Sequence, residues 1–116
     1  MSPRLIDHFQ NPRNVGELRA PALVAEVSNP ICGDVLRLSA RVVEGRIVEI
    51  RYKVRGCAAS IAAGSALTEL MEGKDADALR KLTRDDVDNA VGGLSNESKH
   101  AATLCIDGVR ALLRQL

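Results

Sequence analysis

A chain of 116 residues and 12.4 kDa is the size of one small domain, so we expect residues 1–116 to fold around a single core. Sixteen Lys and Arg residues against fifteen Asp and Glu residues leave a formal charge of +1, which argues against nucleic acid or an anionic membrane as a partner. Aromatic residues make up only 2% of the chain, which excludes a base-stacking platform for single strands.

The N-terminal segment is predicted to form a short helix. Ser2 is a good N-cap, Pro3 suits the first turn, and Asn11-Pro12 ends the helix. The apolar residues that share one face of this helix are Leu5, Ile6 and Phe9.

Three segments have the alternation of apolar and polar residues that is typical of strands, namely 23–28, 35–43 and 46–55. The second and third are predicted to form a hairpin that turns near Glu44-Gly45. We expect its buried face to carry Leu36, Leu38, Ala40, Val42, Val48, Ile50, Tyr52 and Val54. We expect its solvated face to carry a basic strip of Arg37, Arg41, Arg51, Lys53 and Arg55.

The second half of the chain is predicted to be helical. We expect helices over 58–71, 75–82 and 83–90, and a last one from a cap at Ser95 or Asn96 to Leu116. The apolar stripe of the last helix is Ala101, Cys105, Val109, Leu112 and Leu116. A three-stranded antiparallel sheet with helices packed on one face makes the predicted fold class α+β.

The register of the hairpin bears on two of the cysteines. Residues that face each other across a hairpin share a face, and a two-residue turn would set Leu36 against Lys53. We therefore predict a three-residue loop over 43–45, which sets Leu36 against Tyr52. The same ladder sets Cys32 opposite Gly56, so Cys32 and Cys57 are expected to emerge side by side at one end of the sheet.

The three cysteines cannot all pair within one chain, and no signal peptide or membrane-spanning run accompanies them, which favours the reducing cytoplasm. Cys57 precedes a predicted helix, whose N-terminal field favours a thiolate, and Asp34 supplies a carboxylate beside Cys32. Cys32 and Cys57 fall in predicted turns, so we interpret them as a metal or sulfur site rather than as buried hydrophobic residues.

Three motifs then resemble the IscU/NifU-type iron-sulfur cluster assembly scaffolds, including the SufU-like branch. They lie at 6–16 (IDHFQNPRNVG), at 29–34 (NPICGD) and at 56–62 (GCAASIA). The match continues through Ser65, Thr68-Glu69 and Gly73-Lys74, so that it covers nearly the whole chain.

The resemblance implies a SufE/IscU-like fold and a carrier rather than an enzyme. A cysteine desulfurase would deliver sulfur, iron would join it, and a labile [2Fe-2S] cluster would pass to acceptor apo-iron-sulfur proteins. The ligands of the cluster, or of Zn²⁺, would be Cys32, Asp34, Cys57 and His100, with Asp34 keeping the site exchangeable. Two strong thiols per chain leave two states open, a monomer and a homodimer bridged by the cluster.

The chain departs from the family pattern at the third cysteine, where His100 is followed by Ala101. Cys105 lies one helical turn further on, about 6 Å along the axis, whereas bonds from ligands to zinc span only about 2.0–2.3 Å. We therefore expect Cys105 to fill the core. His8, in the first family motif, is interpreted as structural or solvent-facing and not as a ligand.

Two further functions remain open from the sequence. One is a zinc-dependent sulfur-transfer protein that accepts a persulfide from a desulfurase on Cys32 or Cys57. The other is a degenerate scaffold that acts as an interaction module, which is considered because Ala101 stands where the family has its third cysteine. A chaperone motif of the family, Leu-Pro-Pro-Val-Lys, retains only Leu94, so docking of a dedicated Hsp70-type chaperone is not expected.

Overall fold

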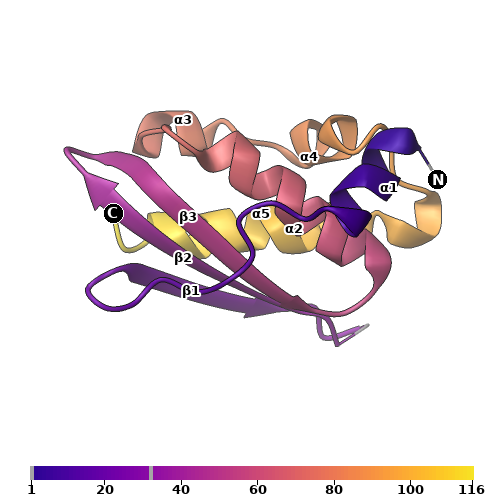
Figure 1. The fold of residues 1–116 in the computed structure, drawn as a ribbon, viewed down its shortest axis with the longest axis horizontal. Helices are drawn as coiled ribbons and strands as arrows, with labels where there is room; N and C mark the ends of the chain where they lie inside the picture. The colour runs from indigo at the N-terminus through magenta and orange to yellow at the C-terminus, as the bar shows by residue number, and fades with distance from the viewer. Residues whose placement is uncertain (1, 32) are drawn as a thin grey trace.

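The computed structural model describes residues 2–31 and 33–116, which form two layers (Figure 1). One layer is an antiparallel sheet in the order β1–β2–β3, and the helices cover one of its faces. The predicted α+β architecture is therefore confirmed. The elements are α1 (Pro3–Gln10), β1 (Leu23–Ser28), β2 (Val35–Val43), β3 (Arg46–Arg55), α2 (Ala58–Met71), α3 (Ala76–Arg80), α4 (Arg84–Ala90), the 3₁₀ helix η1 (Asn96–Ser98) and α5 (His100–Leu113).

The hairpin of β2 and β3 has a different register from the predicted one. Tyr52 pairs with Leu38 rather than with Leu36, and the turn is the two-residue Glu44-Gly45, in which both φ angles are positive. A β-bulge between Arg41 and Val42 supplies the extra residue that keeps the apolar side chains on one face. The prediction of a three-residue loop was wrong because it placed that extra residue in the turn.

The bulge also changes which side chains of β3 are buried. Val48, predicted to be buried, is 53% exposed, whereas its neighbour Ile47 is buried. Further along the ladder the alternation is the predicted one, since Ile50 and Tyr52 are buried. The ladder ends at the pair Val35 and Arg55 near the start of α2, at the end of the sheet opposite the Glu44-Gly45 turn.

The core lies between the sheet and the two long helices, α2 and α5. Tyr52 closes it from the sheet side, since its hydroxyl donates to the carbonyl oxygen of Ile61 on α2 at 2.8 Å. A Cβ at Gly64 would lie 2.6 Å from the Tyr52 ring, so only glycine lets α2 approach β3 so closely. These contacts fix α2 on the sheet, and the starts of α2 and α5 meet at one end of the molecule (Figure 1).

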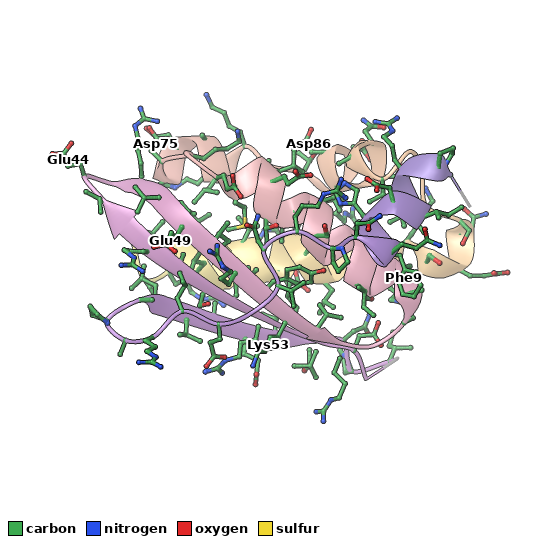
Figure 2. The ribbon with its side chains drawn as sticks, viewed as in Figure 1. Phe9, Glu44, Glu49, Lys53, Asp75 and Asp86 are labelled. Atoms are coloured by element: carbon green, nitrogen blue, oxygen red, sulfur yellow. The ribbon has the colours of Figure 1, made fainter. Side chains whose placement is uncertain are left out.

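The outer face of the sheet is less open than predicted. The segment after α1 crosses it, so that Ser39 is buried and accepts a hydrogen bond from the backbone of Leu18. Arg37 pairs with Glu17 and Glu26, and both Arg41 and Arg51 pair with Glu49. Lys53 and Arg55 remain exposed, and Figure 2 shows Lys53 pointing away from the helices. The predicted basic strip is thus largely neutralised by carboxylates.

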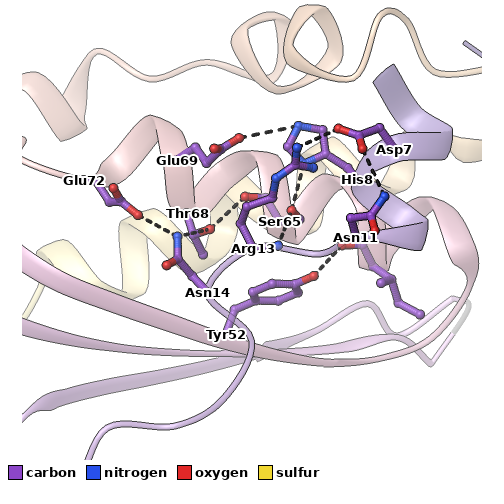
Figure 3. Close-up of polar contacts among 11 residues, drawn as sticks. Asp7, His8, Asn11, Arg13, Asn14, Tyr52, Ser65, Thr68, Glu69 and Glu72 are labelled. Carbon is purple, nitrogen blue, oxygen red and sulfur yellow. Dashed lines mark hydrogen bonds and ion pairs between the residues drawn. The ribbon is translucent and has the colours of Figure 1, made fainter. Parts of the chain in front are cut away.

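The N-terminal segment is held on α2 by a polar network (Figure 3). His8 is buried, and its Nδ1 lies 2.7 Å from Oγ of Ser65, which also accepts a hydrogen bond from the backbone of Arg13. The side chain of Asn14 donates to Thr68 and Glu72 on the same helix. His8 therefore has a structural role, one of the two that the sequence allowed.

The buried face of α1 differs from the apolar face that the sequence indicates. Leu5 is buried together with His8, whereas Ile6 and Phe9 are 39% and 41% exposed. Hydrogen bonding to Ser65 turns the imidazole toward α2, which leaves Phe9 outside (Figure 2).

The C-terminal helices follow the predicted order, with changes at both ends of the last helix. Thr83 and Asp86 form a capping box at the start of α4, where the sequence predicts a helix over 83–90. Ser95 caps η1 rather than the last helix, which begins at His100. The apolar stripe is buried along α5, but the helix ends at Leu113 rather than at the predicted Leu116, which lies beyond it and is 44% exposed. None of the helices in the described ranges has the length and apolar character needed to cross a membrane.

Candidate metal centre

Three elements bring one side chain each to the end of the sheet near the start of α2. Asp34 immediately precedes β2, Cys57 is the N-cap of α2, and His100 is the first residue of α5. In the observed register, the pair after Val35 and Arg55 sets Asp34 beside Gly56. The sheet and the two helices thus assemble a site from parts of the chain that lie far apart in the sequence.

The three side chains offer a sulfur, a nitrogen and an oxygen that all lie within 4.8 Å of one another. Sγ of Cys57 is 3.5 Å from Oδ2 of Asp34 and 3.7 Å from Nε2 of His100. The remaining pair, Nε2 of His100 and Oδ2 of Asp34, is 3.7 Å apart. A thiolate, an imidazole and a carboxylate at this spacing can converge on one metal ion.

The orientation of His100 is set by the 3₁₀ turn before it. Its Nδ1 lies 3.0 Å from the carbonyl oxygen of Glu97. Because a carbonyl oxygen only accepts, Nδ1 carries the hydrogen, and in the neutral ring the lone pair is on Nε2. That lone pair faces Cys57 and Asp34, which is the arrangement that metal-binding histidines use.

Asp34 is buried, yet it remains ionised. Burial acts to raise the pKa of its carboxyl group, but hydrogen bonds from Ser60 and Cys57 outweigh burial and hold the pKa below its usual value. The site therefore holds a buried negative charge, and the groups that contact it, Ser60, Cys57 and His100, all belong to the site. A buried negative charge favours a bound cation.

Gly56 makes room for this carboxylate. A Cβ at position 56 would lie 2.4 Å from Cγ of Asp34 and 2.7 Å from each of its oxygens. Without a side chain, Gly56 leaves free space beside the backbone. In the structure, the Asp34 carboxylate occupies that space.

Ser60 belongs to the site as well, and no sequence argument singled it out. Its buried hydroxyl lies 2.6 Å from Oδ2 of Asp34 and 3.4 Å from Sγ of Cys57. The available signal was its spacing, because a residue three positions after Cys57 on a predicted helix lies on the same face.

The other cysteines have different outcomes. Cys32, predicted as a second thiol of the site, lies outside the described residues. Cys105 is only 2% exposed and belongs to the core, as predicted, and burial raises the pKa of its thiol to about 12. A thiol that stays protonated is neither a nucleophile nor a metal ligand. Among the described residues, the predicted set is thus reduced to Asp34, Cys57 and His100, the one candidate metal group there.

Comparison with known proteins agrees with the resemblance that the three sequence motifs indicate. A family model described as the NifU-like N terminal domain matches residues 1–115. The chain is 42% identical over 109 residues to the iron-sulfur cluster assembly scaffold protein IscU 1 of Archaeoglobus fulgidus, across 94% of this chain and 71% of that protein. It is 35% identical over 117 residues to the scaffold protein IscU of Azotobacter vinelandii, across 97% of this chain and 91% of the other.

A solved structure supports the fold separately. The N-terminal part of a NifU-like protein from Brucella abortus superposes with a TM-score of 0.76 across 98% of this chain and 92% of the other, at 24% identity.

Proposed function

Since the chain belongs to the NifU-like N-terminal domain family, we propose that it is an iron-sulfur cluster assembly scaffold. The observation that carries this proposal is the convergence of Asp34, Cys57 and His100 within 4.8 Å. These donors come from three elements, and a mixed sulfur, nitrogen and oxygen set suits iron and zinc. Iron and the cluster are cargo for such a protein, which makes it a carrier rather than an enzyme.

We further propose that Cys57 accepts sulfur from a cysteine desulfurase. In that step the Cys57 thiolate attacks the outer sulfur of a persulfide on the donor cysteine. The S–S bond of the donor breaks, a new S–S bond forms on Cys57, and the donor leaves as a thiolate, so no external oxidant is needed. Cys57 is exposed and free, which is the access that such an exchange requires.

The finer expectations from the sequence stay part of this proposal. The cargo would be a transient [2Fe-2S] cluster passed to acceptor apo-iron-sulfur proteins, with Cys32 adding a fourth donor to Asp34, Cys57 and His100. Because two strong thiols per chain, Cys32 and Cys57, could supply half of a four-thiol site, the proposal includes both a monomer and a cluster-bridged homodimer. Residues 1–116 would act as one domain, and an odd number of cysteines is the basis for placing it in the cytoplasm.

A zinc-dependent sulfur-transfer protein is the second candidate function. The observation that favours it is Ala101, a fully buried alanine beside His100 at the position where the family has its third thiol. Zinc would then organise the site while Cys57 or Cys32 carries the sulfur. The third possibility, an interaction module without metal chemistry, rests on the same alanine.

Anaerobic reconstitution with iron, sulfide and a desulfurase separates these functions. A scaffold gains visible charge-transfer absorption and bound iron, and both are lost in Cys57→Ala. Stoichiometric zinc together with a persulfide, without those bands, favours sulfur transfer. Neither metal nor persulfide on the folded protein would contradict both functions. Cys105→Ala is the matched control, because it removes a thiol of the core and leaves the site intact.

A further inference from the structure

Ser60 lies behind the candidate metal centre, on the side of the protein interior. It is 1% exposed and occupies the third position of α2, three residues after Cys57. Its hydroxyl is 2.6 Å from Oδ2 of Asp34, the same oxygen that faces Cys57 and His100. The contact is therefore with the carboxylate oxygen that faces the other two candidate ligands.

The direction of this hydrogen bond follows from the charge of Asp34. An ionised carboxylate only accepts, so the single hydroxyl proton of Ser60 is donated to Asp34. The Cys57 thiol has a single proton, which it donates to the same Asp34 oxygen at 3.5 Å, so its 3.4 Å approach to Oγ of Ser60 is a van der Waals contact. The hydrogen bond from Ser60 to Asp34 does not depend on that proton.

We propose that Ser60 is a positioning residue that holds the Asp34 carboxylate in place to complete a metal-binding set with Cys57 and His100. This inference rests on the proposed function. The oxygen keeps a second lone pair for a metal, and outer hydrogen bonds of this kind orient the ligands of metal sites. The buried end of Asp34 is thereby fixed before a metal arrives, so that binding does not have to order it.

A buried serine on α2 can also serve folding alone, and Ser65 is such a residue. Ser65 is fully buried on the same helix, but its hydroxyl bonds to His8 and to the backbone of Arg13. Among the described residues, its hydroxyl forms no hydrogen bond with Asp34, Cys57 or His100, so Ser65 serves as a matched control for Ser60.

Co²⁺ is the probe for the test, because its absorption reports both the number and the type of its ligands. We expect Ser60→Ala to weaken Co²⁺ binding by about 10–100-fold, the range found for outer partners of metal ligands, and to shift its visible bands. Ser60→Thr, which keeps the hydroxyl, should restore both the affinity and the spectrum. Ser65→Ala should lower the midpoint of thermal unfolding without changing either. If Ser60→Ala does not fold by circular dichroism, Ser60→Gly replaces it, because it also removes the hydroxyl and adds no metal ligand.

A double-mutant cycle separates action through Asp34 from action on Cys57. In an Asp34→Ala background, Ser60→Ala should cause no further loss of Co²⁺ affinity. An unchanged affinity and spectrum in Ser60→Ala would overturn the inference, as would an equal loss in the Asp34→Ala background. If instead Cys57→Ala binds Co²⁺ as the parent protein does, the proposed function fails at this site, whatever the result for Ser60.

Discussion

Gly56→Ala tests how closely the Asp34 carboxylate is fitted to the backbone before Cys57. The new Cβ would lie 2.4 Å from Cγ of Asp34, whereas carbon atoms in contact are about 3.5–4.0 Å apart, so the carboxylate must move by about 1 Å. A movement of that size breaks the 2.6 Å bond from Ser60 and moves Oδ2 relative to Cys57 and His100. The substitution therefore acts on the site by displacing Asp34.

The expected cost has two parts. Forcing a methyl group into a filled space costs about 1–3 kcal/mol. At about 2.1 cal/mol/K of unfolding entropy per residue, a chain of 116 residues loses about 4 °C in unfolding midpoint for each kcal/mol, so we expect a fall of about 4–12 °C. Displacing Asp34 should also weaken Co²⁺ binding by about 10–100-fold.

Thermal unfolding without metal and a Co²⁺ titration followed by absorption measure the two parts separately. Gly73→Ala is the matched control, because Gly73 has a φ of +76° but no atom within 4 Å of a new Cβ. It should lose stability through backbone strain and keep the parent affinity for Co²⁺. Parent affinity in Gly56→Ala would refute the assignment of Asp34 to the metal site.

Three other substitutions test other parts of the protein. Cys105→Ala should cost about 1–2 kcal/mol, from lost burial and a small cavity, and leave Co²⁺ binding intact; loss of metal in a folded variant would contradict the core assignment of Cys105. Ala101→Cys should lengthen the lifetime of a reconstituted cluster, and an unchanged lifetime would count against position 101 as part of the site. Burial lowers the pKa of His8 below 6.5, so the unfolded state binds more protons and the free energy of unfolding should rise with pH up to about 6.5. Urea unfolding of His8→Asn between pH 5.5 and 7.5 should show a smaller rise of this free energy with pH than the parent protein. An equal rise would exclude His8 as its source.

Local patterns in the sequence were enough to predict most of the secondary structure. The three strands and α2 have the predicted bounds, because alternation with period two and runs of helix formers act within a few residues. The cap at Ser2 and the capping box at Thr83 were predictable for the same reason, since each hydrogen bond spans three residues. Even Cys105 could be assigned to the core from its place on the stripe of the last helix.

The tertiary structure decided the register, the buried face of α1 and the completion of the site. Because of the bulge near Arg41, Ile47 is in the core in place of Val48, which the alternation predicts to be buried. The extra residue that keeps the apolar side chains on one face could lie either in the turn or within the strands, and tertiary packing placed it within the strands. His8 is buried because Ser65, 57 residues away, offers it a partner. Ser60 meets Asp34 only when α2 lies against the start of β2, a contact that no local pattern contains. The sequence alone thus singled out Asp34, Cys57 and His100 as candidate ligands, and the packing of the helices on the sheet decided which side chains, Ser60 among them, contact these candidates.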